Sequence, residues 1–148
     1  MEKNQEISTI EEKVFDLEDC FTLDAEQEGV FFRPVVQSGY VPFQIKTIGR
    51  NSDRMLVITD KLKKRLAEIS GDAPSEARAI KERDAYVASA VERTTGIKFD
   101  EGVKIKLGGK DFEYTEQMLK MIYTKSPDIM NQVILHSAST EDFYRKKD

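Results

Sequence analysis

The sequence predicts an α+β fold with an N-terminal β-hairpin region, a central antiparallel helix pair, a second short β-hairpin and short C-terminal helices. Three observations lead to this prediction. Two β-type runs flank a glycine turn in residues 14–50, apolar side chains recur at helical spacing in residues 51–95, and a Gly-Gly pair separates two alternating runs in residues 97–144. We expect one domain, residues 14–144, with a flexible acidic tail before it, residues 1–13, and a short tail after it, residues 145–148.

Composition restricts the class of protein. The 148 residues carry 23 Lys and Arg against 27 Asp and Glu, a net charge of −4, which lacks the basic surplus of a general nucleic-acid binder. One cysteine and one histidine exclude an internal disulfide and a Cys- or His-rich metal centre. The acidic first residues are unlike a signal peptide, and no apolar run approaches the roughly 18–20 residues that span a bilayer. We therefore expect a soluble intracellular protein without metal, cofactor or membrane contact.

The β-rich region contains two runs of β-branched and aromatic residues, 30–36 and 43–47, on either side of the turn residues 37–39. This pattern predicts a β-hairpin. Pro34 and Pro42 lack a main-chain donor, so we expect them at edges or bulges.

The central region predicts two helices. The first has an N-cap in Asn51-Ser52-Asp53 and one apolar stripe, formed by Met55, Ile58, Leu62, Leu66 and Ile69. The second begins with a cap at Ser75 and ends at Thr94-Thr95-Gly96. Its apolar side is thickened by small residues that permit the close approach of another helix, Ala85, Ala88 and Ala90. The short loop between the two helices predicts an antiparallel pair.

Beyond the helix pair, residues 103–107 and 110–114 alternate around Gly108-Gly109. A two-residue hairpin is predicted, because both central positions of such a turn need a positive φ. Thr115 caps a third helix, and Ser126-Pro127 starts another with a capping Ser and a first-turn Pro. A last short helix carries Phe143 and Tyr144.

Two single residues and one acidic run suggest chemistry, but structural roles fit them better. Cys20 has no local base, so we expect a buried or half-buried cysteine, and His136 is expected to be a packed or surface residue of a helix. The stretch 14–23 is predicted to be irregular or a short strand. The acidic residues in and next to this stretch are Asp16, Glu18, Asp19 and Asp24. The run has neither the central glycine nor the ligand spacing of a calcium-binding loop, so we predict that these residues form a solvated face.

Two groups of basic residues could likewise be either binding sites or ordinary structural features. Gly108-Gly109-Lys110 lacks the spacing and the following helix of a phosphate loop, which favours the hairpin. The basic residues of the first helix predict a solvated face, with a docking patch for an acidic partner as the alternative: Lys61, Lys63, Lys64 and Arg65. Neither grouping predicts an enzyme.

The C-terminal aromatic and methionine residues are the most informative set. At a helical period, Met121, Tyr123 and Met130 cannot all face one core, and methionine suits surfaces that bind irregular partners. We therefore predict a partner-binding groove on the third helix pair, formed by Phe112, Tyr114, Met118, Met121, Ile122, Tyr123, Ile129, Met130 and Val133.

The order of elements resembles the tail assembly chaperones of long-tailed bacteriophages. Three segments carry the resemblance: residues 28–32 leading to 43–46, Gly49 and Ser52; residues 108–116, which look like the short hairpin running into a capped helix; and residues 121–123, 126–129 and 132–133, which look like the pair of short helices. The resemblance implies a non-enzymatic phage protein of the host cell cytoplasm. It also implies binding to apolar helical segments of the tape-measure protein or to tail-tube subunits, and a frameshifted longer form in some members.

Two other interpretations stay open beside the chaperone. A virion subunit of the tail or connector would use the hairpin at 29–49 to add strands to a neighbour's sheet, which would make the protein a homo-oligomer. A small regulator would instead bind a host protein or nucleic acid, although the acidic balance favours a protein partner.

Overall fold

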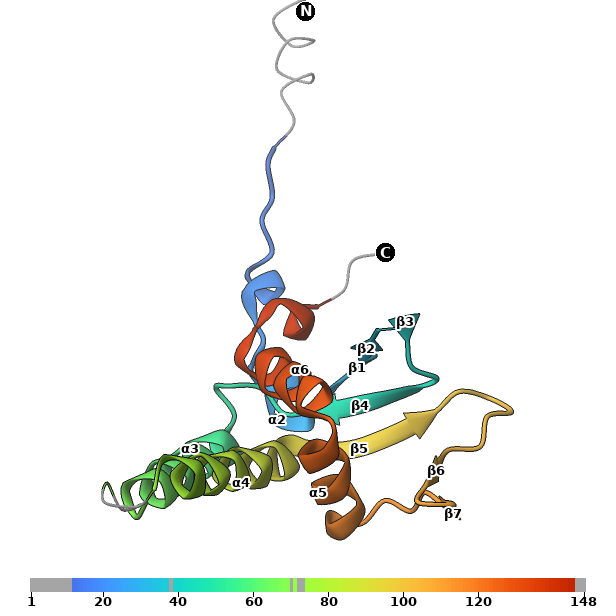
Figure 1. The fold of residues 1–148 in the computed structure, drawn as a ribbon. Coiled ribbons are helices and arrows are strands. Elements are labelled where there is room, and N and C mark those ends of the chain that lie inside the picture. The colour runs from blue at the N-terminus through green and yellow to red at the C-terminus, as the bar shows by residue number, and fades with distance from the viewer. Residues whose placement is uncertain (1–11, 38, 70, 72–73, 146–148) are drawn as a thin grey trace, which may run out of the picture.

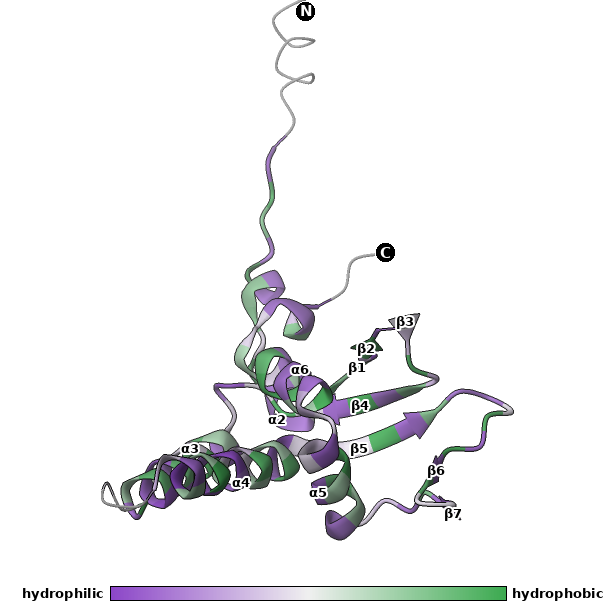
Figure 2. Cartoon of the chain, in the orientation of Figure 1, coloured by the Kyte–Doolittle hydropathy of each residue, from purple (hydrophilic) through white to green (hydrophobic). Residues whose placement is uncertain are grey.

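A three-stranded antiparallel sheet organises the chain (Figure 1). The computed structural model describes residues 12–37, 39–69, 71 and 74–145. The sheet order is β1-β4-β5, with bounds Val30–Phe32, Phe43–Thr47 and Thr94–Phe99. Because residues alternate sides along a strand, the cross-strand neighbours on the core face are Phe32, Ile45 and Ile97. In Figure 2, polar and apolar residues alternate in bands along β4 and β5.

The predicted N-terminal hairpin is confirmed, and it consists of two successive strand pairings. Beyond the β1–β4 pairing, β2 (Val35–Val36) pairs with β3 (Gly39–Tyr40). Pro34 and Pro42 fall between the two ladders, where neither ladder needs their missing donor. The turn residue Ser38 lies outside the described residues.

The strand β5 is absent from the sequence prediction. Thr94-Thr95-Gly96 was expected to end a helix, but the chain passes straight from the last helical residue, Arg93, into the strand. The two threonines are β-branched and therefore favour a strand, and the apolar pattern of the helix has ended before them.

The predicted helix pair is α3 (Asp53–Ala67) and α4 (Ser75–Arg93), which lie side by side in Figure 1. Ser52 caps α3 as predicted, since its Oγ accepts a hydrogen bond from the Met55 N–H at 3.2 Å. The predicted cap of α4 is wrong by one residue: Ser75 is the first helical residue and Pro74 is the N-cap.

The C-terminal region follows the prediction. A short hairpin, β6 (Lys106–Leu107) and β7 (Lys110–Asp111), precedes α5 (Glu116–Lys125) and α6 (Pro127–Ala138). The caps are also as predicted, because side-chain oxygens of Thr115 and Ser126 accept the main-chain N–H three residues on. A 3₁₀ turn, η2 (Glu141–Phe143), takes the place of the last short helix.

The N-terminal stretch differs from the prediction. Residues 14–23, expected to be irregular or a short strand, contain a 3₁₀ turn, η1 (Leu17–Cys20). A short helix that was not predicted, α2 (Leu23–Glu28), follows it. Asp16 caps η1 by accepting a hydrogen bond from the Glu18 N–H at 2.9 Å. Of the predicted acidic tail 1–13, residues 1–11 lie outside the described residues, as do residues 146–148 of the C-terminal tail.

The main core lies where the sheet meets α4, α5 and α6. Its buried members are Ile45, Val87, Ala90, Phe112, Leu119, Tyr123, Ile129, Met130 and Val133. A smaller cluster anchors the start of α3 beside the end of β4, formed by Ile48, Met55 and Ile58.

A fully buried carboxylate fixes α2 to the loop that leads into α3. Glu26 accepts hydrogen bonds from the Asn51 N–H at 3.0 Å, the Asn51 side-chain amide at 3.1 Å and the Thr22 hydroxyl at 2.7 Å. Burial raises the pKa of this carboxyl, but the hydrogen bonds outweigh burial and the net pKa is lowered. Gly49 packs directly on the Glu26 side chain, since a Cβ at Gly49 would lie 2.2 Å from Glu26 Cγ.

We expect the Gly49→Ala substitution to lower the free energy of unfolding by about 2 kcal/mol or more, because the new methyl group must displace a buried, hydrogen-bonded side chain. Urea denaturation followed by circular dichroism measures the change. Gly96→Ala is the matched control, since its Cβ meets nothing closer than 3.7 Å. Equal stabilities of the two variants would contradict this account of Gly49.

Candidate partner-binding site

The nine residues predicted to bind a partner do not form one open surface. Five are buried in the core, namely Phe112, Tyr123, Ile129, Met130 and Val133. Met118 and Ile122 are half-buried against that core, while Tyr114 and Met121 are exposed by 49% and 48%. The predicted groove on the α5–α6 pair is therefore filled by the packing of this chain itself.

The helical period explains the division on α5. Tyr123 is 1% exposed, whereas Met121, two positions earlier, lies roughly 200° around the helix and faces solvent. The expectation that Met121, Tyr123 and Met130 cannot share one core is thus confirmed. The sequence showed that these residues divide between two faces, but it did not show that Met121 is the one that points outward or that Tyr123 and Met130 line the interior.

An open surface lies instead along α4. Three adjoining hollows of about 400, 330 and 360 Å³ follow α4, and we call them together the α4 trough. The first lies between α3 and α4, and the other two extend to α5. Neighbouring hollows share lining residues: the first two share Arg65, Asp84 and Ala88, and the last two share Val91, Glu92 and Glu116.

The floor of the trough is one stripe of α4. Its residues are spaced by 3, 1, 3, 3 and 1, which is a helical face, and they are Lys81, Asp84, Ala85, Ala88, Val91 and Glu92. At the usual helical rise, the distance from Lys81 to Thr94 is about 20 Å. Val87 and Ala90 lie on a different face and belong to the core, whereas on the trough side Ala85 is buried, Ala88 and Val91 are half-buried, and Lys81 and Asp84 are exposed.

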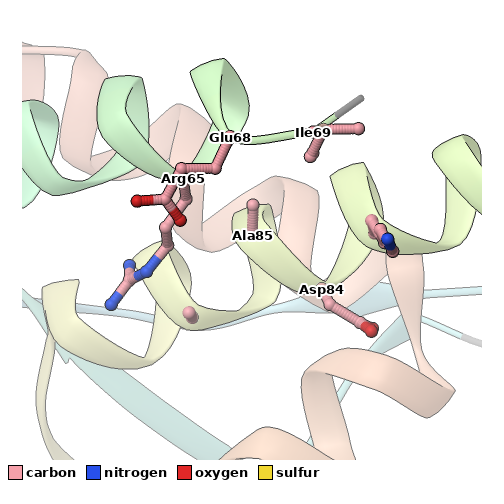
Figure 3. A pocket seen from close by; sticks show the side chains of 7 residues that line it. Arg65, Glu68, Ile69, Asp84 and Ala85 are labelled. Atoms are coloured by element: carbon pink, nitrogen blue, oxygen red, sulfur yellow. The ribbon is translucent and has the colours of Figure 1, made fainter. Parts of the chain in front are cut away.

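Charged side chains of α3 and α5 form the walls. Figure 3 shows Arg65 of α3 and Glu68, the C-cap of α3, beside Ala85 and Asp84 of α4 in the outer hollow. On the other side, the wall consists of Glu116 and Lys120 of α5, and the inner end is lined by Tyr114, Leu119 and Thr94. Tyr114 is thus the one residue of the predicted site that lines the trough.

A three-membered ion cluster crosses the middle of the trough. Glu92 Oε1 lies 2.7 Å from Arg65 Nη1, and Glu92 Oε2 lies 3.3 Å from Lys61 Nζ. Burial raises the pKa of Glu92, but the hydrogen bonds and charges of Arg65 and Lys61 prevail, so the net pKa is lowered. Of the four basic residues predicted to form a solvated face, these two hold α3 against α4.

Hydrogen bonds to Thr94 hold in place α5, which forms one wall of the trough, and Tyr114 at its inner end. The Thr94 hydroxyl donates to the Ala90 carbonyl at 2.9 Å and therefore accepts from the Tyr123 hydroxyl at 2.7 Å. The Tyr114 hydroxyl donates to the Thr94 carbonyl at 3.3 Å. Burial raises the pKa of both tyrosines.

A buried arginine ties α4 to α6. Arg93 donates from Nε to the Ser89 hydroxyl at 3.1 Å and from Nη1 to the Ser137 hydroxyl at 2.8 Å. Burial lowers its pKa, and the cation lies in the last turn of α4 beside the last turn of α6. The negative ends of both helices stabilise a cation at this position.

The single histidine locks α6 onto the sheet. His136 Nδ1 and Thr47 Oγ1 are hydrogen-bonded at 2.6 Å, and the ring stacks on Phe32 with centroids 4.5 Å apart. Its Nε2 lies 3.2 Å from Asp142 Oδ2 without hydrogen-bond geometry, so we regard that contact as electrostatic. Burial lowers the pKa of His136 more than Asp142 raises it. His136 is therefore a packed residue, one of the two expectations.

Two other expectations concern the N-terminal acids and the cysteine. Asp16, Glu18 and Asp19 converge on Arg145, whose single positive charge offsets part of the charge of this acidic face. Cys20 is exposed, which corrects the expectation of a buried or half-buried residue. Within the described ranges, no group of three or more His, Cys, Asp or Glu side chains could hold a metal ion.

The chain matches no protein-family model, and no curated protein or solved structure is significantly similar to it. Each helix in the described part of the chain is too short or too polar to cross a bilayer.

We expect the free energy of unfolding to fall as the pH drops below about 6.5, the ordinary pKa of histidine. The folded state holds the pKa of His136 below that value, so the unfolded chain takes up the proton first, and stability present at higher pH is lost. Urea denaturation at a series of pH values measures the effect. The His136→Gln variant should show a smaller slope between about pH 7 and pH 5, and an unchanged slope would contradict the assignment.

Proposed function

We propose that this chain is a non-enzymatic bacteriophage tail assembly chaperone that binds apolar helical segments of the tape-measure protein and helps the tail tube to assemble. The observation that carries the proposal is the α4 trough, a channel whose floor presents Ala85, Ala88 and Val91 between charged residues of the same helix, and whose walls are charged. The resemblance of the sequence to tail assembly chaperones supports the same class of protein.

A helix is the partner whose shape fits the trough. The small side chain of Ala88, which is half-buried, allows a second helix axis to approach α4, and a trough about 20 Å long accommodates roughly four helical turns. The apolar stripe of the client would cover Ala88 and Val91, while its polar flanks would meet Lys81 and Glu68 at one end and Glu116 and Lys120 at the other. Walls of both signs favour a client with both signs beside its stripe.

A tape-measure protein offers such stripes before the tube encloses it. Exposed apolar helical faces aggregate in water, and a small acidic cover would keep them dispersed. The net charge of −4 suits this role, and the site of action would be the host cell cytoplasm. A tail-tube subunit is the second partner that the proposal includes.

One structural feature favours the alternative of a virion subunit of the tail or connector. The sheet has β1 and β5 at its edges, and an edge strand can pair with a strand of a neighbouring subunit. Mass spectrometry of purified particles separates the two functions, because a chaperone leaves before maturation and a virion subunit stays.

We expect Ala88→Arg to weaken binding of a helical tape-measure segment by roughly tenfold or more, because the long side chain fills the floor of the trough. Isothermal titration calorimetry measures the affinity. Ala79→Arg is the matched control, since Ala79 is exposed on α4 and does not line the trough. Unchanged affinity of the Ala88→Arg variant, with its fold intact by circular dichroism, would exclude the trough as the client site.

Met121→Glu tests the outer face of α5, the exposed remainder of the surface predicted from the sequence. Met121 lines none of the three hollows, so binding in the trough predicts an affinity within about twofold of the parent chain. Loss of binding in this variant together with full binding by Ala88→Arg would move the client site to the outer face of α5. Absence of any complex with the parent chain would refute the chaperone function.

A further inference from the structure

The described N-terminal segment, residues 12–16, exposes apolar side chains that its own chain does not cover. It has no regular structure, and Val14 and Phe15 are 85% and 65% exposed. Figure 1 shows the segment leaving the molecule next to η1 and the C-terminal turn η2, away from β5. Two adjacent β-formers in an extended, uncovered segment are what a pairing strand requires.

An acceptor for such a strand exists at the other side of the sheet. The six-residue strand β5 is the last strand in the order β1-β4-β5, and β4 pairs with only one of its edges. The outer edge of a terminal strand presents main-chain N–H and C=O groups that can pair with another chain.

The two faces of the sheet beside β5 differ in chemistry. Lys98 and Lys46 lie on the face away from the core, with Lys46 Nζ 5.7 Å from the centroid of the Phe31 ring. Ile97 and Phe99 lie on the core face, where they line an apolar slot together with Phe43, Ile105, Phe112 and Ile122. A strand added here would therefore need acids on one side and an apolar residue on the other.

The N-terminal segment alternates in the same way. Glu12, Val14 and Asp16 fall on one side of an extended chain, and Lys13 and Phe15 fall on the other. With Glu12 facing Lys46 and Lys98, Phe15 covers the mouth of the apolar slot beside Phe99, while Asp16 keeps its contacts with the Glu18 N–H and Arg145. Both the charges and the apolar surfaces then match across the new pair.

We propose that residues 12–16 of one copy of this chain add as a fourth strand to the outer edge of β5 in a second copy. Donor and acceptor lie at different places on the molecule, so the contact is heterologous. Repeated contacts of this kind close into a ring or continue as an open chain.

Sedimentation velocity over a concentration series tests the proposal on the full chain. We expect a species larger than the monomer to grow with concentration. Val14→Pro should abolish it, because proline cannot donate to the ladder, while the matched control Val14→Thr should keep it. Val14 is exposed and outside any helix or strand, so neither change should affect the fold. A monomer at all concentrations, or association unaffected by Val14→Pro, would overturn the proposal.

Cross-linking identifies the acceptor. In a Cys20→Ser background, mild oxidation of a mixture of the Val14→Cys and Lys98→Cys variants should yield a disulfide-linked dimer containing one copy of each. Mixing Val14→Cys with Lys104→Cys, an exposed position outside β5, should not. Equal yields from the two mixtures would exclude β5 as the acceptor. Client binding in the α4 trough involves none of these residues, so these experiments test self-association independently of the proposed chaperone function.

Discussion

The direct passage from α4 into β5 is the constraint on which the other features depend. Arg93 is the last helical residue and Thr94 the first residue of the strand, so no loop separates the two elements. The Ile48 N–H donates to the Arg93 carbonyl at 3.1 Å, which fixes the junction to the end of β4. Since one rigid stretch of backbone supplies the trough floor and then the sheet edge, the orientation of each surface is set by the other.

Buried polar pairs, and not apolar area alone, determine how the helices sit on this junction. Arg93 reaches Ser137, and His136 reaches Thr47, so two adjacent residues of α6 are bound to α4 and to β4. A buried donor or acceptor that loses its partner costs more than a typical made bond gains, so these pairs penalise any other placement of α6. With α6 and α5 fixed on the inner face of α4, Ala88 on the trough side stays partly exposed, while Ala85 is buried.

The elements that could be predicted from the sequence are those whose own residues carry every signal of the element. The helices with a stripe and a capping side chain, such as those after Ser52, Thr115 and Ser126, were predicted, as was the hairpin at Gly108-Gly109. The strand β5 was missed because its first residues also fit a helix end. At the candidate site, spacing showed that Met121 and Tyr123 point to different sides, but which side is covered depends on packing between distant segments. The alanines of α4 gave the signal for the trough, since small residues on a helix indicate close approach without naming the partner.

The junction also gives a physical reason why the two proposed surfaces would influence each other. Tyr114 lines the inner end of the trough, and its hydroxyl binds the carbonyl of Thr94, the first residue of β5. A client helix that packs on Tyr114 therefore acts on a group bonded to the acceptor strand. Thr94 is held by Ala90 and Tyr123 as well, so the strand cannot shift at this point without breaking buried bonds. Binding in the trough would thus stiffen the edge of β5 rather than release it, and a rigid edge is the better template for a pairing strand.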